Sequence, residues 1–254
     1  MTVTLSKVRY EEMLPHEIVE ARNKVPIAYL PIGNLEWHGE HLVVGTDAIK
    51  AHTLAICIAE RGGGLVFPPL FYGENREHGN LEFDFDPMGK VAEKMGLQKS
   101  NFMLGHMRKP SYLQDVLYIE LLIHILYEIE SLGFKVIIMV VGHYPSIHHA
   151  NEAIKEYSKT GKAKVWAVCG YEIVKDIIPD AGDHAAKWET SLLMALRPEC
   201  VDMERLPKNK DVPLLGVVGI DPRETASKDF GEFAVNIIVD RVLSKARQLL
   251  AEQD

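Results

Sequence analysis

The sequence has 254 residues, of which 47% are hydrophobic and 25% are charged, which is typical of a soluble globular protein. No apolar run approaches the ~18 residues that a membrane span needs. The net charge of −8, without a long stripe of Lys and Arg, argues against a phosphate-binding surface, so we expect neither membrane nor nucleic-acid binding.

The cysteines and the N-terminal segment bear on the cellular compartment. Cys57, Cys169 and Cys200 are odd in number, far apart and outside any C-x-x-C arrangement, which favours a reducing compartment over a disulfide framework. Residues 1–17 carry charge throughout and contain no apolar h-region, so we expect no secretory signal. The expected location is the cytoplasm.

Short apolar runs alternate with longer helical patterns along the chain, as in βαβ units around a parallel sheet. In chain order, strands are expected at 25–32, 65–68, 134–141 and 164–169, and helices at 48–60, 112–131, 147–159, 184–196 and 230–251. No repeat and no Pro/Ser-rich linker divides the chain. We therefore predict one α/β domain over residues 1–254 with a mostly parallel central sheet.

Two segments depart from this simple alternation. Residues 72–110 mix Gly, Asn, Asp, Met and aromatic residues in no clean period, and we interpret them as an insertion or lid over the active site. The helix at 112–131 is apolar around most of its circumference, more than one core-facing stripe can use. That pattern predicts a homo-oligomer, although a buried central helix would explain it equally well.

The densest cluster of polar residues follows the first predicted strand, at the sheet edge where open α/β folds place their sites. Glu36 and His38 are two residues apart, so in extended backbone their side chains point to the same side. Asp47 stands where a helix is expected to begin. This set of Glu, His and Asp suits Zn²⁺ or Mn²⁺, and the absence of Cys argues against a structural zinc site. Alternatively, Asp47 is a helix N-cap and the other two are solvated loop residues; the nearby Glu40 and His41 favour the metal site.

A second cluster, Gly142-His143, ends the most apolar predicted strand, so it lies at the same sheet edge as the first. The alternative for His143 is a simple turn histidine. His148 and His149 follow, but adjacent residues on a helix point about 100° apart and cannot both face one metal, so we leave them out of the site.

A third cluster contains His184 and Glu189. On a predicted helix, Glu189 shares one face with apolar residues such as Leu192 and Leu193, and burial of an unpaired carboxylate is costly. Either a metal ion or a basic side chain would offset that cost, and a salt-bridged glutamate at a helix–helix seam is the alternative to a ligand. His184, at the helix start, can point into the same space as a proton carrier.

These clusters together resemble the creatininase (creatinine amidohydrolase) family. Its members carry the motifs G-x-x-E-x-H-G-x-H-L, T-D, G-H and H-x-x-x-x-E-T-S in that order, found here at Gly33–Leu42, Thr46-Asp47, Gly142-His143 and His184–Ser191. The resemblance implies a layered α/β/α fold, a homo-oligomer that is often a hexamer, and two divalent metals, Zn²⁺ and/or Mn²⁺, with Fe²⁺ as a further option. It also implies hydrolysis of a C–N bond in a cyclic or linear amide of a small polar molecule.

The same resemblance implies a role for each matched residue. Asp47 would bridge the two metals, Glu36 and His143 would complete one site, and His38 would belong to the other. His184 would match the family's proton-transferring histidine.

One departure from the family pattern affects the ligand set. Creatininase has a metal-binding glutamate two residues after the histidine of its G-H motif, where this chain has Pro145. We therefore predict that Glu189 supplies the missing ligand.

Two other functions stay open at this point. One is a hydrolase that opens the ring of a cyclic sugar-like ketone or a lactone. The other is a metal- or metabolite-binding protein that has lost catalysis, against which the retained His184 and the full set of N/O ligands argue.

Overall fold

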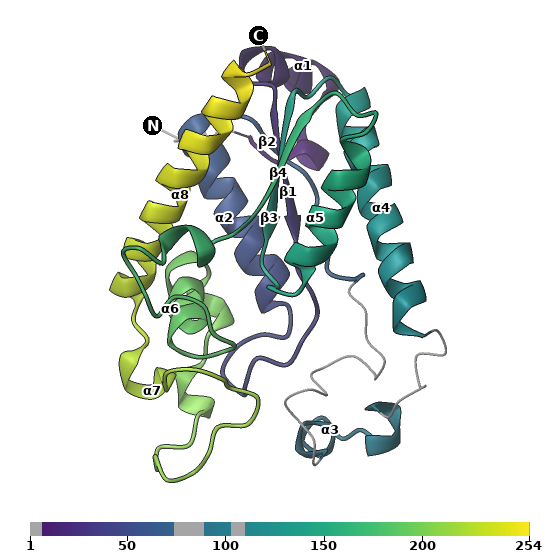
Figure 1. Cartoon of the computed structure of the whole chain (residues 1–254). Helices are drawn as coiled ribbons and strands as arrows, with labels where there is room; N and C mark the ends of the chain where they lie inside the picture. Colours follow the sequence, from purple (N-terminus) through teal and green to yellow (C-terminus); the bar gives the residue numbers. More distant parts are fainter. Residues whose placement is uncertain (1–6, 74–88, 103–109, 254) are drawn as a thin grey trace.

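A four-stranded parallel sheet forms the centre of the computed structural model, which describes residues 7–73, 89–102 and 110–253 (Figure 1). The strand order is β2-β1-β3-β4, and each neighbouring pair runs parallel. The strands are β1 (Ile27–Ile32), β2 (Leu65–Val66), β3 (Val136–Val141) and β4 (Lys164–Cys169). The predicted parallel sheet is confirmed.

The apolar runs form strands that are covered on both faces. Every residue of β1 and β3 is buried, which explains why neither strand alternates between apolar and polar residues. Side chains nevertheless alternate between two separate cores: Tyr29 and Ile138 face one, whereas Leu30 and Met139 face the other.

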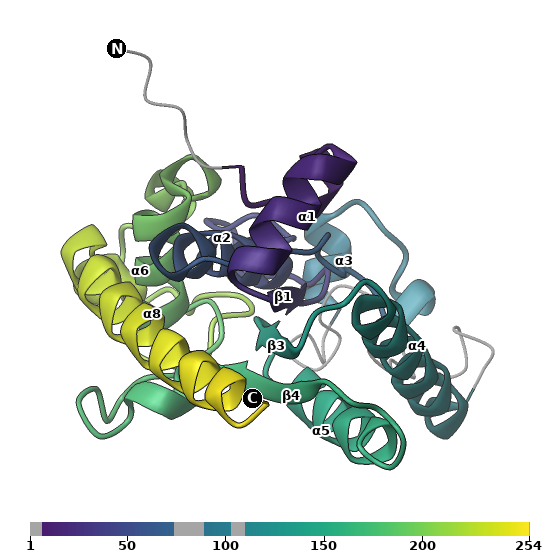
Figure 2. The same ribbon diagram turned by 90° about the horizontal axis from the view of Figure 1, so that it is seen from above.

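Helices cover the two faces of the sheet, which makes three layers (Figures 1 and 2). One face carries α2 (Thr46–Gly62), α6 (Lys187–Leu196) and α8 (Lys228–Ala251), and the other carries α4 (Ser111–Ser131) and α5 (Ser146–Tyr157). The predicted layered α/β/α fold is confirmed. Within the described ranges, no helix combines the length and the apolar character needed to cross a bilayer.

Three short helices fall outside the predicted elements: α1 (Pro15–Lys24), α3 (Lys90–Lys94) and α7 (Pro222–Thr225). α1 begins with a proline, and the Glu17 carboxylate accepts a hydrogen bond from Leu14 N at 2.7 Å. α3 and a 3-10 turn at Lys99–Phe102 are the helical parts of the predicted insertion at 72–110. Residues 74–88 and 103–109 of that insertion lie outside the described residues, so the lid stays a prediction.

The predicted start of one helix is wrong, and the error matters for the site. α6 begins at Lys187, not at His184. The Asp183 carboxylate accepts hydrogen bonds from Trp188 N at 2.6 Å and Glu189 N at 3.2 Å, and it thereby caps the helix later than the sequence pattern indicated. His184 instead pairs its backbone with Val218 in an antiparallel bridge.

Candidate metal centre

The predicted site residues gather at the carboxyl edge of the sheet, where β1 and β3 end and α2 begins. Two glycines allow this close approach, because a Cβ at Gly33 would lie 2.3 Å from Ala48 N and one at Gly142 would lie 2.0 Å from Asp47 O. The N-cap of α2 is Gly45, so Asp47 is not the cap. Its side chain lies instead between the two strand ends, 1% exposed.

Glu36, Asp47 and His143 form the first group whose atoms are placed to hold a cation. His143 Nδ1 lies 2.8 Å from Glu36 Oε2 and 2.9 Å from Asp47 Oδ2, and all three side chains are buried. Burial alone would raise the pKa of both carboxyl groups, but contacts with His143 and His38 outweigh it and hold both pKa values below their usual range. The group therefore presents two carboxylates and an imidazole to a cation.

His38, Asp47 and Glu189 form the second group. His38 Nε2 lies 3.3 Å from Asp47 Oδ1 and 3.4 Å from Glu189 Oε2, while Nδ1 lies 3.1 Å from the Glu36 carbonyl oxygen and donates to it. Burial would lower the pKa of His38, but the carboxylates of Asp47, Glu189 and Glu36 raise it to about 9. In the described part of the chain His38 Nε2 has no hydrogen-bond partner. The negative field that favours a proton on this nitrogen also favours a metal ion, which would displace the proton.

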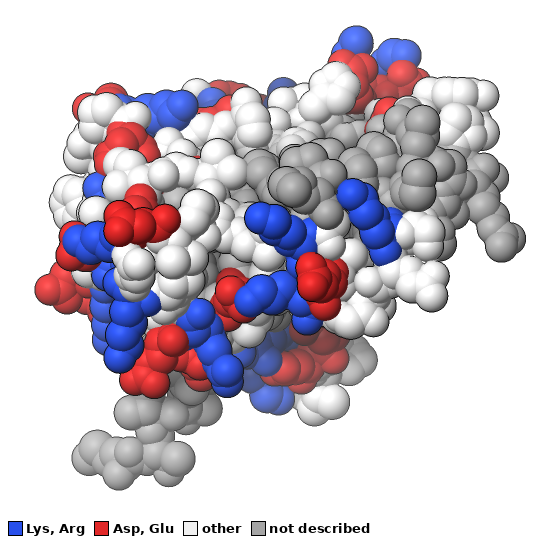
Figure 3. Space-filling model, turned by 90° about the horizontal axis from the view of Figure 1, so that it is seen from below, with Lys and Arg blue, Asp and Glu red and all other residues white. Residues whose placement is uncertain are grey.

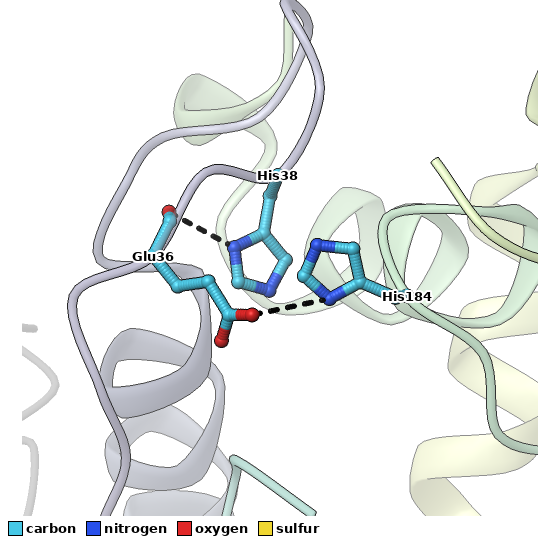
Figure 4. Close-up of side chains that lie close together, drawn as sticks. All are labelled: Glu36, His38 and His184. Atoms are coloured by element: carbon cyan, nitrogen blue, oxygen red, sulfur yellow. Dashed lines mark hydrogen bonds and ion pairs between the residues drawn. The ribbon is translucent and has the colours of Figure 1, made fainter. Parts of the chain in front are cut away.

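His184 completes a third group with Glu36 and His38, shown in Figure 4. Its ring lies 4.4 Å from the His38 ring, and its Nδ1 is 3.8 Å from Glu36 Oε1. Nε2 donates to the Trp37 carbonyl oxygen at 2.8 Å, which turns Nδ1 toward the site (Figure 4). Burial, followed by the charge of His38, lowers the pKa of His184. The arrangement presents a neutral imidazole nitrogen beside both ligand groups.

The buried carboxylate of Glu189 has a basic partner, Lys50, which the sequence analysis did not identify. Lys50 Nζ donates to Glu189 Oε1 and lies 3.6 Å from Asp47 Oδ1, and Ala185 N donates to Glu189 Oε2 at 2.8 Å. Burial would lower the pKa of Lys50, but Glu189 and Asp47 outweigh it and raise that pKa. The sequence did contain an indication that Lys50 is buried, because helical spacing places it on the same face of α2 as Asp47 and Leu54.

The remaining polar residues of the motifs lie outside the ligand groups. His41 Nε2 lies 2.9 Å from Thr190 Oγ1, and burial, with the charge of His38, lowers the pKa of His41 to about 4. Glu40 pairs with Lys94 near the surface. His149 Nε2 lies 2.8 Å from Asp115 Oδ1, outside the three groups.

A cavity of about 630 Å³ opens beside the ligand groups, within the range that small-molecule sites occupy. Both ligand groups contribute to its lining, together with His184 and apolar residues of α2, α6 and α8. Tyr144 and Tyr171 stack edge to face at 5.0 Å in the same lining. Seen from this side of the molecule, acidic and basic side chains are interspersed (Figure 3).

The parallel sheet and the histidines and carboxylates at its carboxyl edge define a layered α/β enzyme with a candidate metal centre. A family model described as creatinine amidohydrolase matches residues 11–244. The chain therefore belongs to the creatininase family of metal-dependent amidohydrolases, and the resemblance seen in the motifs is confirmed.

Curated relatives and solved structures cover most of the chain. Creatinine amidohydrolase of Pseudomonas putida is 24% identical over 87% of this chain and 89% of its own length. The mycofactocin precursor peptide peptidase of Mycolicibacterium smegmatis is 25% identical over 88% and 87%, respectively. A crystal structure of creatininase matches with a TM-score of 0.70, 23% identity and coverage of 95% of this chain and 97% of that chain. A structure named as creatininase with Mn matches with the same TM-score and identity over 95% and 98%.

Proposed function

We propose that this chain hydrolyses a C–N bond in a cyclic or linear amide of a small polar molecule, with two divalent ions, Zn²⁺ and/or Mn²⁺. The observation that carries the proposal is the position of Asp47 between two ligand groups. Its Oδ2 lies 2.9 Å from His143 Nδ1 in the first group, and its Oδ1 lies 3.3 Å from His38 Nε2 in the second. A carboxylate shared in this way can bridge two cations.

Each ion has a proposed set of ligands. Glu36, Asp47 and His143 would hold the first ion, and His38, Asp47 and Glu189 would hold the second. A pair of ions bound there would supply an activated water that loses its proton near neutral pH and a Lewis acid for the carbonyl oxygen of the substrate. Glu189 would fill the position that Pro145 leaves without a ligand.

The chain's own contribution to the chemistry is the placement of His184. The Trp37 carbonyl oxygen accepts from His184 Nε2 and holds the ring so that Nδ1 faces the site. We propose that the unprotonated Nδ1 first accepts the proton that the attacking water gives up, and then transfers that proton to the departing nitrogen, as a general base and acid placed beside the reacting bond. The lowered pKa of His184 helps it to release that proton.

The size and lining of the cavity support a small substrate. Its volume of about 630 Å³ suits a compact molecule, and its lining includes the carboxylates of Glu36, Asp47 and Glu189. The names of two relatives, an amidohydrolase of creatinine and a peptidase, both denote cleavage of an amide C–N bond. We propose that this chain cleaves the same type of bond as these relatives, but we do not assign it the substrate of either.

The test is hydrolysis of a substrate panel before and after metal removal. Cyclic amides, formamides and short peptides form one arm, and cyclic ketones and lactones form the other. We expect turnover in the amide arm that a chelator abolishes and Zn²⁺ or Mn²⁺ restores. Turnover confined to the ketone and lactone arm would replace amide hydrolysis with ring opening by the same site. Metal binding with no turnover in either arm would favour a protein that has lost catalysis.

We also propose a cytoplasmic homo-oligomer. The three cysteines are free, as is usual in a reducing compartment. One side of α4 packs into the core through Leu122 and Leu126, yet Val116, Leu117 and Leu121 are exposed on the same helix. Burial of this second apolar side against another copy would explain its composition, with a hexamer as the form that the family resemblance suggests.

A further inference from the structure

The second ligand group contains a cation of the chain's own, the ammonium group of Lys50. This side chain is 7% exposed, and it reaches the group from the first turns of α2, three residues after Asp47. Burial of an ammonium group is costly unless carboxylates compensate it. Here Glu189 and Asp47 do so, through the contact with Glu189 Oε1 and the distance of 3.6 Å to Asp47 Oδ1.

The contacts of Lys50 are asymmetric between the two groups. Of the two oxygens of Asp47, Lys50 lies near Oδ1, which faces His38, whereas Oδ2 faces His143 in the first group. Its other partner, Glu189, belongs to the second group alone. The charge of Lys50 therefore acts mainly on the second group.

We propose that Lys50 is an internal competitor for the second metal ion. Its ammonium group neutralises Glu189 when the second ion is absent, and it repels that ion when it enters, so the second ion binds more weakly than the first. This inference rests on the proposed function, because it presupposes a metal in each group.

The physical argument compares the charges in the second group. Asp47 and Glu189 bring two negative charges, one of which is shared with the first group, and Lys50 cancels one of them. A dication that enters then meets a ligand set with little net negative charge and an ammonium group at short range in a buried site, where screening by water is weak. Glu189 Oε2 stays directed at His38 Nε2 at 3.4 Å, so the ligand geometry does not require that Lys50 leave.

An opposite role for Lys50 predicts the opposite result. If Lys50 served only to hold Glu189 in place for the metal, its removal would release that carboxylate and lower the affinity for the second ion. The direction of the change in affinity for the second ion therefore separates competition from positioning.

The experiment is a zinc titration of the chelator-stripped wild type and of Lys50→Met. Calorimetry measures the dissociation constants, and native mass spectrometry counts the bound ions. Methionine keeps an unbranched side chain of similar length and removes the charge. We expect the dissociation constant of the second ion to fall at least tenfold and that of the first to change little. Arg61→Met is the matched control, because it removes a positive charge from an exposed position on the same helix and should change neither constant.

A second variant tests whether the effect passes through Glu189. Glu189→Gln should strongly reduce the affinity for the second ion. In the Glu189→Gln background, Lys50→Met should no longer raise that affinity. If Lys50→Met does not fold without metal, the proteins are loaded with zinc first and challenged with increasing chelator. The variant should then retain its second ion at chelator concentrations that remove it from the wild type.

Three outcomes would overturn the inference. If the second ion binds to Lys50→Met with the same affinity as to the wild type, competition is excluded. If it binds to the variant more weakly than to the wild type, Lys50 has a positioning role instead. If wild type, variant and control all bind no ion, the proposed function itself is wrong, and the role of Lys50 falls with it.

Discussion

Asp47 is the residue on which both proposed metal positions depend. Asp47→Ala should lose both ions, because each carboxylate oxygen faces a different ligand group, whereas His38→Ala should lose mainly the second. Elemental analysis after dialysis against limiting zinc measures both, with circular dichroism to verify the fold. Equal and small losses in the two variants would show that Asp47 has only a structural role in the first turn of α2.

His184 belongs to the proton transfer and not to the ligand sets that we propose. His184→Ala should lower kcat by about 10²–10⁴-fold, the usual contribution of a general acid, while metal content stays near the wild-type value. Steady-state kinetics on the best amide of the panel, together with zinc analysis of the same sample, give both numbers. Unchanged kcat, or loss of metal along with activity, would remove His184 from this role.

Most of the candidate site could be predicted from the sequence, because residues that follow the ends of parallel strands lie at one edge of the sheet. That argument placed Glu36, His143 and Asp47 together, and the structure brings their ligand atoms into one group. It did not identify Lys50 as the partner of Glu189. The two lie 139 residues apart, and their contact depends on how α2 packs beside α6, which no local pattern encodes.

Among the secondary structure elements, those with continuous apolar runs were predicted well. The central strands are continuous buried apolar runs, and α4 and α8 are long helices rich in apolar residues. α1 was missed because none of its residues is buried, so its sequence shows no strong apolar stripe. The start of α6 was misplaced because Asp183 directly precedes His184 and would suit a helix that begins there. In the structure its carboxylate instead accepts from Trp188 N and Glu189 N, so the helix begins at Lys187.

The C-terminal turn of α4 offers a test of fold stability that is independent of the metal centre. Glu130 accepts hydrogen bonds from the Tyr157 hydroxyl and, at 2.7 Å, from Lys162 N. It thereby joins α4 to the last residue of α5 and to the segment that follows. Partial burial raises the pKa of Glu130, but these hydrogen bonds outweigh it and lower the pKa. A lowered pKa means that this carboxylate stabilises the fold above its unfolded pKa, and that the stabilisation disappears as the pH falls through the folded pKa.

Glu130→Gln should therefore reduce the free energy of unfolding at pH 7 by about 0.5–1 kcal/mol, after allowance for solvent screening. The difference from the wild type should shrink as the pH drops below about 4, where the glutamate itself becomes protonated. Urea unfolding at several pH values measures it. Glu128→Gln, an exposed glutamate on the same helix, serves as the control. A difference that grows toward acid pH would contradict this account.

At the scale of the whole molecule, the proposed homo-oligomer makes α4 the element to perturb. Leu117 is 57% exposed and lies among other exposed apolar side chains of that helix. Leu117→Lys should therefore shift the protein toward the monomer with little loss of stability, because the side chain is outside the core. Light scattering coupled to size exclusion, across a range of concentrations, measures the mass. A wild type that is monomeric throughout would reject the proposal.

The central claim is that two ligand groups, joined by Asp47, hold two metal ions. The most direct measurement is a crystal structure of the zinc-loaded protein with anomalous diffraction at the zinc edge. We predict two peaks roughly 3.5–4 Å apart, one among Glu36, Asp47 and His143 and the other among His38, Asp47 and Glu189. At limiting zinc the second peak should be the weaker. No peak in either group, or a single peak away from Asp47, would contradict the account.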